Sequence, residues 1–227
     1  MRRYSICLLA ILLSLPLWAQ EEKNPVIVIS EMTKAAEAGD RAAQRDLALK
    51  YLNGVDLPQD FDSAAKWMQK AAAQGDALAE AHLGRMYLEG EGVGHDSSEG
   101  IKWLRKAAED GSALGQAALG NALYDGRGVD RNVNEAVKWF AKAADQGNPA
   151  GLYGMGRAAS EGKGTGENLG EAYTWFALAA RFGQSDAKLA LPVLDATLSK
   201  GKIEDAKRRA DDWIKAHPNV KVPDQAQ

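Results

Sequence analysis

The chain has 227 residues, of which 45% are hydrophobic and 26% are charged, and its formal net charge at pH 7 is −3. This weakly acidic balance argues against a nucleic-acid groove and against binding to an anionic membrane surface. The one cysteine, Cys7, allows no intramolecular disulfide and no site with several cysteine ligands for a metal.

Residues 1–19 are typical of an export signal. Arg2 and Arg3 precede an apolar run at residues 6–17, which is too short to span a bilayer as a mature helix. Ala19 is a small residue at the expected cleavage point. We therefore expect a cleaved signal peptide and a periplasmic or secreted chain with no stable membrane insertion. An uncleaved anchor is the alternative.

Residues 20–38 are predicted to form an N-terminal capping half-repeat. The sequence "KAA" at 34–36 and Gly39 keep the register of the units that follow. Asn24 is a candidate helix N-cap, and Pro25 lies at the favoured first helical position. The β-branched stretch at 26–30 favours an extended alternative for this segment.

Residues 39–182 contain four units of 36 residues: 39–74, 75–110, 111–146 and 147–182. One tryptophan recurs at the same place in every unit, and three series of glycines keep the same interval. The tryptophans are Trp67, Trp103, Trp139 and Trp175. A fixed period of this length predicts stacked helical hairpins, because one hairpin cannot bury its apolar face alone.

Each unit is predicted to hold two helices. The first ends at a glycine suited to a left-handed cap, such as Gly90, and the second begins at an Asp or Asn N-cap, such as Asp96. Glu99, three residues later, would complete a capping box. Gly84, Gly120 and Gly156 in the first helices predict close approach of a neighbouring helix. The tryptophans are predicted to lie in the core.

Residues 183–218 are predicted to form C-terminal capping helices. Pro192 replaces the mid-helix glycine and is expected to bend or break the first of them, and Pro218 ends the last. Residues 219–227 are expected to be a disordered tail.

The segment "AEAHLGRMYLEGEGVGHDSSEGIKWLRKAAEDG", residues 79–111, resembles the Sel-one-like repeat, a relative of the tetratricopeptide repeat. This resemblance covers about residues 39–182. It implies an all-α, right-handed solenoid that binds partner proteins. Exported bacterial relatives serve as adaptors, envelope regulators, host-interaction factors or immunity proteins against secreted toxins.

No catalytic, cofactor or metal site is predicted. The three histidines lie in different contexts, so none has a second ligand at zinc spacing. Two Ser-x-x-Lys tetrads, Ser63–Lys66 and Ser160–Lys163, lack the partner motifs of β-lactam-binding enzymes. Because a cysteine-rich branch of the family has been linked to β-lactam binding, an envelope enzyme acting on peptidoglycan or β-lactams is the alternative function.

One stripe of each first helix is held neither by the core nor by a close neighbour. We predict that these stripes line a concave surface and bind a protein or peptide partner. The function would be that of a scaffold, an inhibitor or immunity protein, or an envelope regulator. A merely solvated stripe is the alternative. The predicted partner-binding residues are Asp46, Leu49, Leu78, His82, Arg85, Glu89, Leu114, Asn121, Asp125, Arg157 and Glu161.

Overall fold

The computed structural model describes residues 25–164 and 168–223, which form eleven α-helices and no strand. The helices are α2 (Pro25–Glu37), α3 (Arg41–Asn53), α4 (Phe61–Ala73), α5 (Ala77–Glu89), α6 (Ser97–Glu109), α7 (Ala113–Asp125), α8 (Val133–Asp145), α9 (Pro149–Glu161), α10 (Leu169–Arg181), α11 (Ser185–Thr197) and α12 (Lys200–Ala216). The all-α prediction is confirmed, and the segment at 26–30 is helical. The predicted signal peptide lies outside the described residues. Among these helices, none is both long and apolar enough to cross a membrane.

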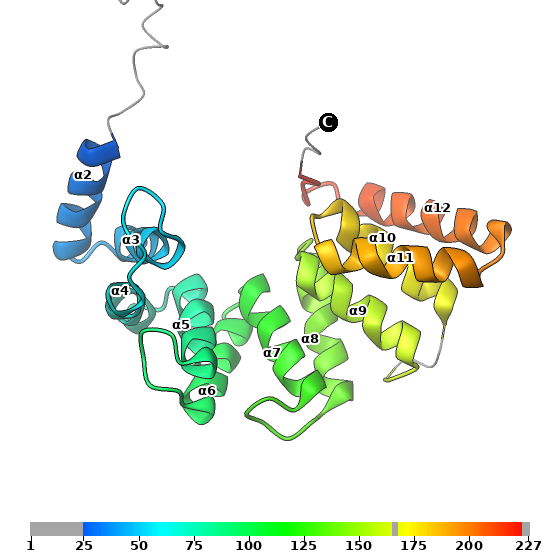
Figure 1. Cartoon of the computed structure of the whole chain (residues 1–227), viewed down its shortest axis with the longest axis horizontal. Helices are drawn as coiled ribbons and strands as arrows, with labels where there is room; N and C mark the ends of the chain where they lie inside the picture. The colour runs from blue at the N-terminus through cyan, green and yellow to red at the C-terminus, as the bar shows by residue number, and fades with distance from the viewer. Residues whose placement is uncertain (1–24, 165–167, 224–227) are drawn as a thin grey trace, which may run out of the picture.

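The helices stack into an arched solenoid, with α2 at one end and α10 to α12 at the other (Figure 1). The hairpins are the pairs α3–α4, α5–α6, α7–α8 and α9–α10. First helices of successive repeats also touch, α5 with α7 and α7 with α9, whereas the second helices make fewer contacts with one another. The first helices therefore line the concave surface.

The helix ends follow the predicted chemistry. Gly90 closes α5 at φ 72°, in the left-handed region, and the Asp96 side chain accepts a hydrogen bond from the Glu99 amide at 3.0 Å. The second hydrogen bond of the predicted capping box, from the Asp96 backbone N–H to the Glu99 side chain, is not formed. The Asp96 backbone N–H instead donates to the Tyr87 carbonyl at 2.9 Å, which ties α6 back to α5.

The mid-helix glycines allow close packing, as predicted. A Cβ atom added to Gly120 would lie 2.7 Å from the Phe140 ring, and one added to Gly84 would lie 2.8 Å from the Leu104 side chain. These distances are well below van der Waals contact. The first and second helices of a repeat therefore approach each other as only glycine permits.

The four tryptophans pack against the core, but they are not buried within it as predicted. Trp139 is half-buried, whereas the next residue, Phe140, is fully buried. The Trp139 indole N–H donates to Glu135 at 3.3 Å, and the Lys142 ammonium lies 4.1 Å from the ring centroid. An indole keeps its polar N–H paired by lying at the edge of the core, so the residue after it fills the centre.

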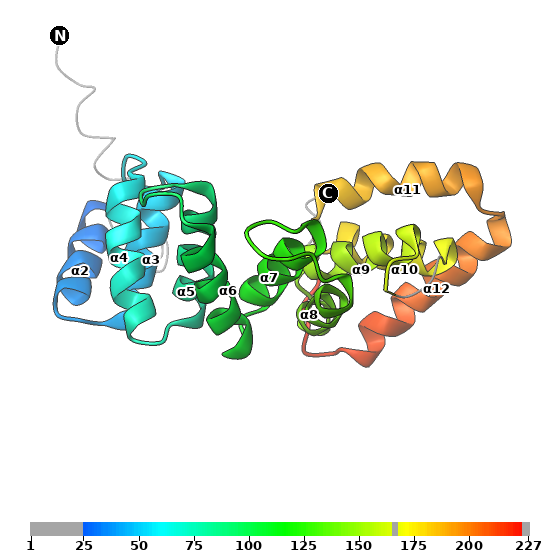
Figure 2. The ribbon, with the colours of Figure 1, turned by 90° about the horizontal axis from the view of Figure 1, so that it is seen from below.

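The C-terminal cap differs in part from the prediction. Pro192 does not break α11, which was one of the two outcomes expected for it, and its exposed position leaves the unpaired carbonyl of the preceding turn accessible to water. The tail prediction is wrong for residues 219–223, because Val220 and Val222 pack against the core. Residues 224–227 lie outside the described part. Helix α10 lies between α11 and α12 (Figure 2).

Candidate partner-binding surface

The predicted stripe forms two rows along the concave surface. Arg85, Asn121 and Arg157 share one repeat position, and Glu89, Asp125 and Glu161 share the position one turn later. Because the first helices stack side by side, equivalent residues become neighbours in space. The result is a row of basic and amide groups beside a row of carboxylates.

A central hollow of about 290 Å³ lies on this surface between α5, α7, α9 and the start of α11. It brings together five predicted residues from three first helices. They are Arg85, Glu89, Asn121, Asp125 and Arg157. Residues of different repeats thus converge on one site, although they lie far apart in the sequence.

Two further hollows continue along the first helices toward the N-terminus. One of about 260 Å³ is lined by His82, Arg85 and Glu89, and another of about 350 Å³ by Asp46 and Leu49. Eight of the eleven predicted residues therefore line one of these three hollows. The other three line none of them. Leu78 is 36% exposed on α5, Leu114 is half-buried, and Glu161 pairs with Arg157 at 3.9 Å.

The sequence prediction missed four polar or aromatic residues of the central hollow. These are Arg127, Tyr153, Gln184 and Asp186. Arg127 lies in a hairpin loop, which the stripe did not include. Asp186 occupies the stripe position on α11 that Leu78 occupies on α5, so extending the repeat register past Gly183 would have found it.

Arg157 also has a structural role. Its guanidinium pairs with Asp125 of the preceding repeat at 3.0 Å and lies 4.6 Å from the Tyr124 ring centroid. These contacts join repeats three and four. The expectation that the stripe is held by no close neighbour is therefore wrong for Arg157. Arg85 is freer, since its side chain is 44% exposed and its pair with Glu89 is 3.5 Å long.

His82 lines the hollow of about 260 Å³. The ionisation of its imidazole makes the stability of the fold depend on pH. Burial, together with the nearby charge of Arg85, lowers the pKa of the His82 imidazole from 6.5 to about 4. The unfolded chain then binds a proton that the folded chain excludes between these values. Stability is therefore complete above pH 6.5 and falls as the pH drops toward 4.

We expect His82→Gln to remove this dependence. Urea unfolding at a series of pH values should show that the parent chain loses about 2–3 kcal/mol more than the variant between pH 7 and pH 4. Parallel curves for the two proteins would contradict the burial of His82 as a neutral imidazole.

Buried amides bridge the helices in repeats one and three. The Gln44 side chain donates to the Ala36 carbonyl at 3.0 Å and accepts from Gln74 at 2.8 Å. Gln116 and Gln146 form the same pair at 2.8 Å. A buried amide with both ends paired fixes the spacing of the helices around it.

Repeat two carries acids at both of these positions. Glu80 is fully buried, and its Oε1 atom accepts from Lys106, which also donates to Asp110 at 3.3 Å. The Oε2 atom of Glu80 has no hydrogen-bond partner among the described residues. A buried oxygen without a donor costs free energy that an amide would recover.

We expect Glu80→Gln with Asp110→Gln to raise the free energy of unfolding by about 1 kcal/mol, because the amide pair of repeats one and three is then restored. Chemical denaturation measures the change. The matched control is the reverse exchange in repeat three, Gln116→Glu with Gln146→Asp, which should destabilise the chain. A loss of stability in the first variant would contradict this account of Glu80.

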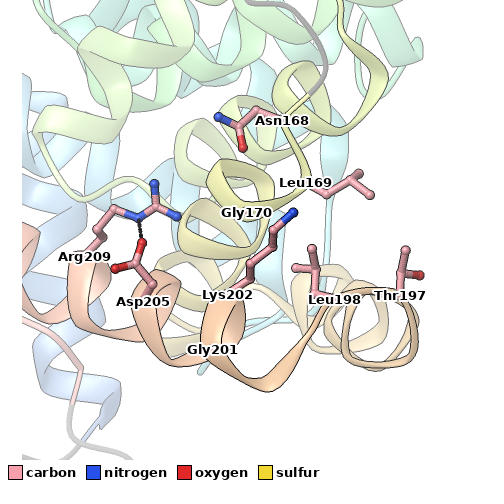
Figure 3. A pocket seen from close by; sticks show the side chains of 9 residues that line it. All are labelled: Asn168, Leu169, Gly170, Thr197, Leu198, Gly201, Lys202, Asp205 and Arg209. Atoms are coloured by element: carbon pink, nitrogen blue, oxygen red, sulfur yellow. Dashed lines mark ion pairs between the residues drawn. The ribbon is translucent and has the colours of Figure 1, made fainter.

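A fourth hollow, of about 750 Å³, lies away from the stripe between α10, α11 and α12 (Figure 3). Arg209 and Asp205 form an ion pair of 3.6 Å on its wall, and Lys202 points into it. It contains none of the predicted residues. Within the described ranges, no group of three metal-ligating side chains is close enough to hold an ion.

The Ser-x-x-Lys tetrads are used in local structure. The Ser63 hydroxyl donates to Asp60 at 2.6 Å, at the start of α4. The Ser160 hydroxyl donates to the Arg157 carbonyl at 3.0 Å, and Lys163 pairs with Glu161. A nucleophilic serine needs a nearby base to take its proton. Neither hydroxyl is hydrogen-bonded to the lysine of its tetrad.

Four stretches of the chain match the Sel1 repeat: residues 41–76, 77–112, 113–148 and 149–181. A Sel1 repeat protein from Oxalobacter formigenes is 30% identical, with a TM-score of 0.71 over 88% of this chain and 81% of that protein. A Sel1 repeat protein from Klebsiella pneumoniae is 26% identical, with a TM-score of 0.57 over 86% of this chain and 93% of that protein.

A protective antigen of uropathogenic Escherichia coli strains, which displays an SLR fold, is 27% identical with a TM-score of 0.76. The alignment covers 91% of this chain and 46% of the antigen, so the chain spans about half the length of that protein. Among curated proteins, none matches the chain significantly.

Proposed function

The chain belongs to the Sel1 repeat family, whose members generally mediate protein–protein interaction, and from this premise we propose that its concave surface binds a segment of a partner protein. The observation that supports this proposal most directly is the central hollow. It gathers Arg85, Asn121 and Arg157 from three repeats into one site. Such a site exists only in the stacked array.

The shape of the surface favours an extended partner over a small molecule. Three shallow hollows follow one another along the first helices, and the two nearest each other share Arg85 and Glu89. Small-molecule sites are usually single, deep and mostly apolar. Two mostly polar hollows followed by a mostly apolar one at α3 suit a polypeptide that crosses several repeats.

The rows of opposite charge make the surface selective. Arg85 and Arg127 are exposed at the central hollow, with Glu89 and Asp186 beside them. A partner with both acidic and basic side chains in the matching order would be held, whereas a uniformly charged one would be repelled by one row. This is the recognition expected of an inhibitor, an immunity protein or an envelope regulator.

We also propose that the chain acts outside the cytoplasm. Arg2 and Arg3, the apolar run at 6–17 and Ala19 support export. N-terminal sequencing of material from the periplasm should find a start near Gln20. An intact Met1 on the exported chain, or its retention in carbonate-washed membranes, would overturn this part of the proposal.

Photo-cross-linking tests the binding surface. A photoreactive amino acid replaces Asn121 in the central hollow, or Lys138 on α8, the second helix of the same repeat, as the matched control, in the chain produced in its own host. We expect one protein, identified by mass spectrometry, to be linked from position 121 and not from position 138. Equal yields from both positions would overturn the concave site.

A further inference from the structure

Helix α11 ends the stack of first helices with an apolar strip that the described chain does not cover. Leu189 and Val193, one turn apart, are 75% and 66% exposed. These are the highest values among the bulky apolar side chains of the described ranges. Apolar side chains grouped in this way often mark a contact site.

The repeat register shows what shape of partner the strip would accept. Leu189 occupies the repeat position of Ala81 and Ala117, which are buried on α5 and α7. Those two helices pack against the next first helix, α7 and α9 respectively. In the described part, α11 is followed by α12, which packs on the opposite side of α10 (Figure 2). The place beside Leu189 is therefore one that an α-helix fills in repeats two and three.

The other flank of α11 is polar. Lys188 and Asp195 are exposed at positions where Gln116 and Leu123 of α7 are buried. Terminal repeats usually carry polar groups where the array ends and water begins. The apolar strip is therefore a local exception on a helix that is otherwise adapted to solvent.

The strip continues into the proposed partner site. Gln184 and Asp186, at the start of α11, line the central hollow, and Val193 has the repeat position of Asn121. Two apolar side chains are far short of the roughly 800 Å² per partner of a stable dimer. A second copy meeting this one at α11 alone would gain little, whereas a partner that already occupies the hollow could extend onto the strip.

We propose that α11 binds an amphipathic α-helix of the partner, whose apolar pair at positions i and i+4 lies on Leu189 and Val193. Its polar flank faces Asp186 and Arg127 at the hollow. This inference rests on the proposed function, and it adds the partner's chemistry and the helix that anchors it. Helix-in-groove recognition uses this spacing of anchors.

The test uses a displayed library of short helix-forming peptides selected against the full chain. We expect the selected peptides to share an apolar i, i+4 pair. A labelled member should bind Leu189→Glu with Val193→Glu at least about tenfold more weakly than the parent chain. The matched control on the same helix, Lys188→Glu, carries the same change of net charge and should bind as the parent does. Both variants change exposed side chains, and thermal melts verify that they fold.

Peptides that lack the apolar pair, or that bind both variants equally, would overturn the assignment of α11. Self-association of the chain in sedimentation, abolished by the α11 variant, would assign the strip to a second copy and also overturn it. A protein cross-linked at position 121 that binds the α11 variant with full affinity leaves the proposed function standing and removes this inference. If the selection yields such peptides but no protein is cross-linked from position 121, the result would support the α11 site and overturn the concave site.

Discussion

Replacing Phe140 by alanine is expected to lower the free energy of unfolding by about 3–5 kcal/mol, among the largest losses for a single change in this chain. Phe140 is fully buried, and its ring lies against Gly120 and Gly154, where an added Cβ would come within 2.7 and 2.5 Å. The two glycines opposite the ring have no side chain that could move into the space it leaves, so a cavity remains. Urea or thermal unfolding measures the loss.

The neighbouring Trp139→Ala is the control for this prediction. The indole is half-buried and its N–H pairs with Glu135, so we expect a loss of about 1–2 kcal/mol. Equal losses for Phe140 and Trp139 would show that the ring at the edge supports the core as much as the ring at its centre.

Reversing two charges at the central hollow is expected to weaken partner binding strongly. Arg85→Glu with Arg127→Glu places two more carboxylates beside Glu89 and Asp186. We expect a loss of about 2 kcal/mol or more, which is about thirtyfold in Kd. Stability should change by less than about 0.5 kcal/mol, since both side chains are exposed. Calorimetry with the cross-linked partner measures the affinity.

The matched control for binding is Lys66→Glu with Lys102→Glu on the second helices. Both lysines are exposed, and they belong to α4 and α6. This variant carries the same change of charge, so any general electrostatic effect appears in both proteins. Equal losses of affinity would place the partner site elsewhere. Arg157 is unsuited to the test, because its pair with Asp125 also joins two repeats.

The fold was largely predictable because one period repeats every structural signal. Gly90 and Asp96 specify where one helix ends and the next begins, and Gly84 specifies how closely they pack. The position of Trp139 at the edge of the core was not predictable from size and hydrophobicity alone. It depends on the hydrogen bond to Glu135, which exists only once the helix has formed.

The candidate site was predictable only as a face. The repeat register placed Arg85 and Asn121 on one stripe, and the structure brings both to the central hollow. Arg127 was missed because a loop residue has no helical period to place it. Helix α11 was treated as a cap because Pro192 interrupts the glycine series, yet it is helical throughout and its first residues line the central hollow. Leu189 is exposed because α12 packs on α10 and not on α11. The repeat pattern of the sequence does not show which of the two helices α12 contacts.

Hydrogen–deuterium exchange of the chain, alone and with the cross-linked partner, tests the concave-surface claim most directly. Binding along the first helices predicts slower exchange in α5, α7 and α9, and in α11 if the partner helix docks there, with α6 and α8 unchanged. Protection confined to the second helices α4, α6 and α8 would contradict the claim, because the predicted partner-binding residues all belong to the first helices.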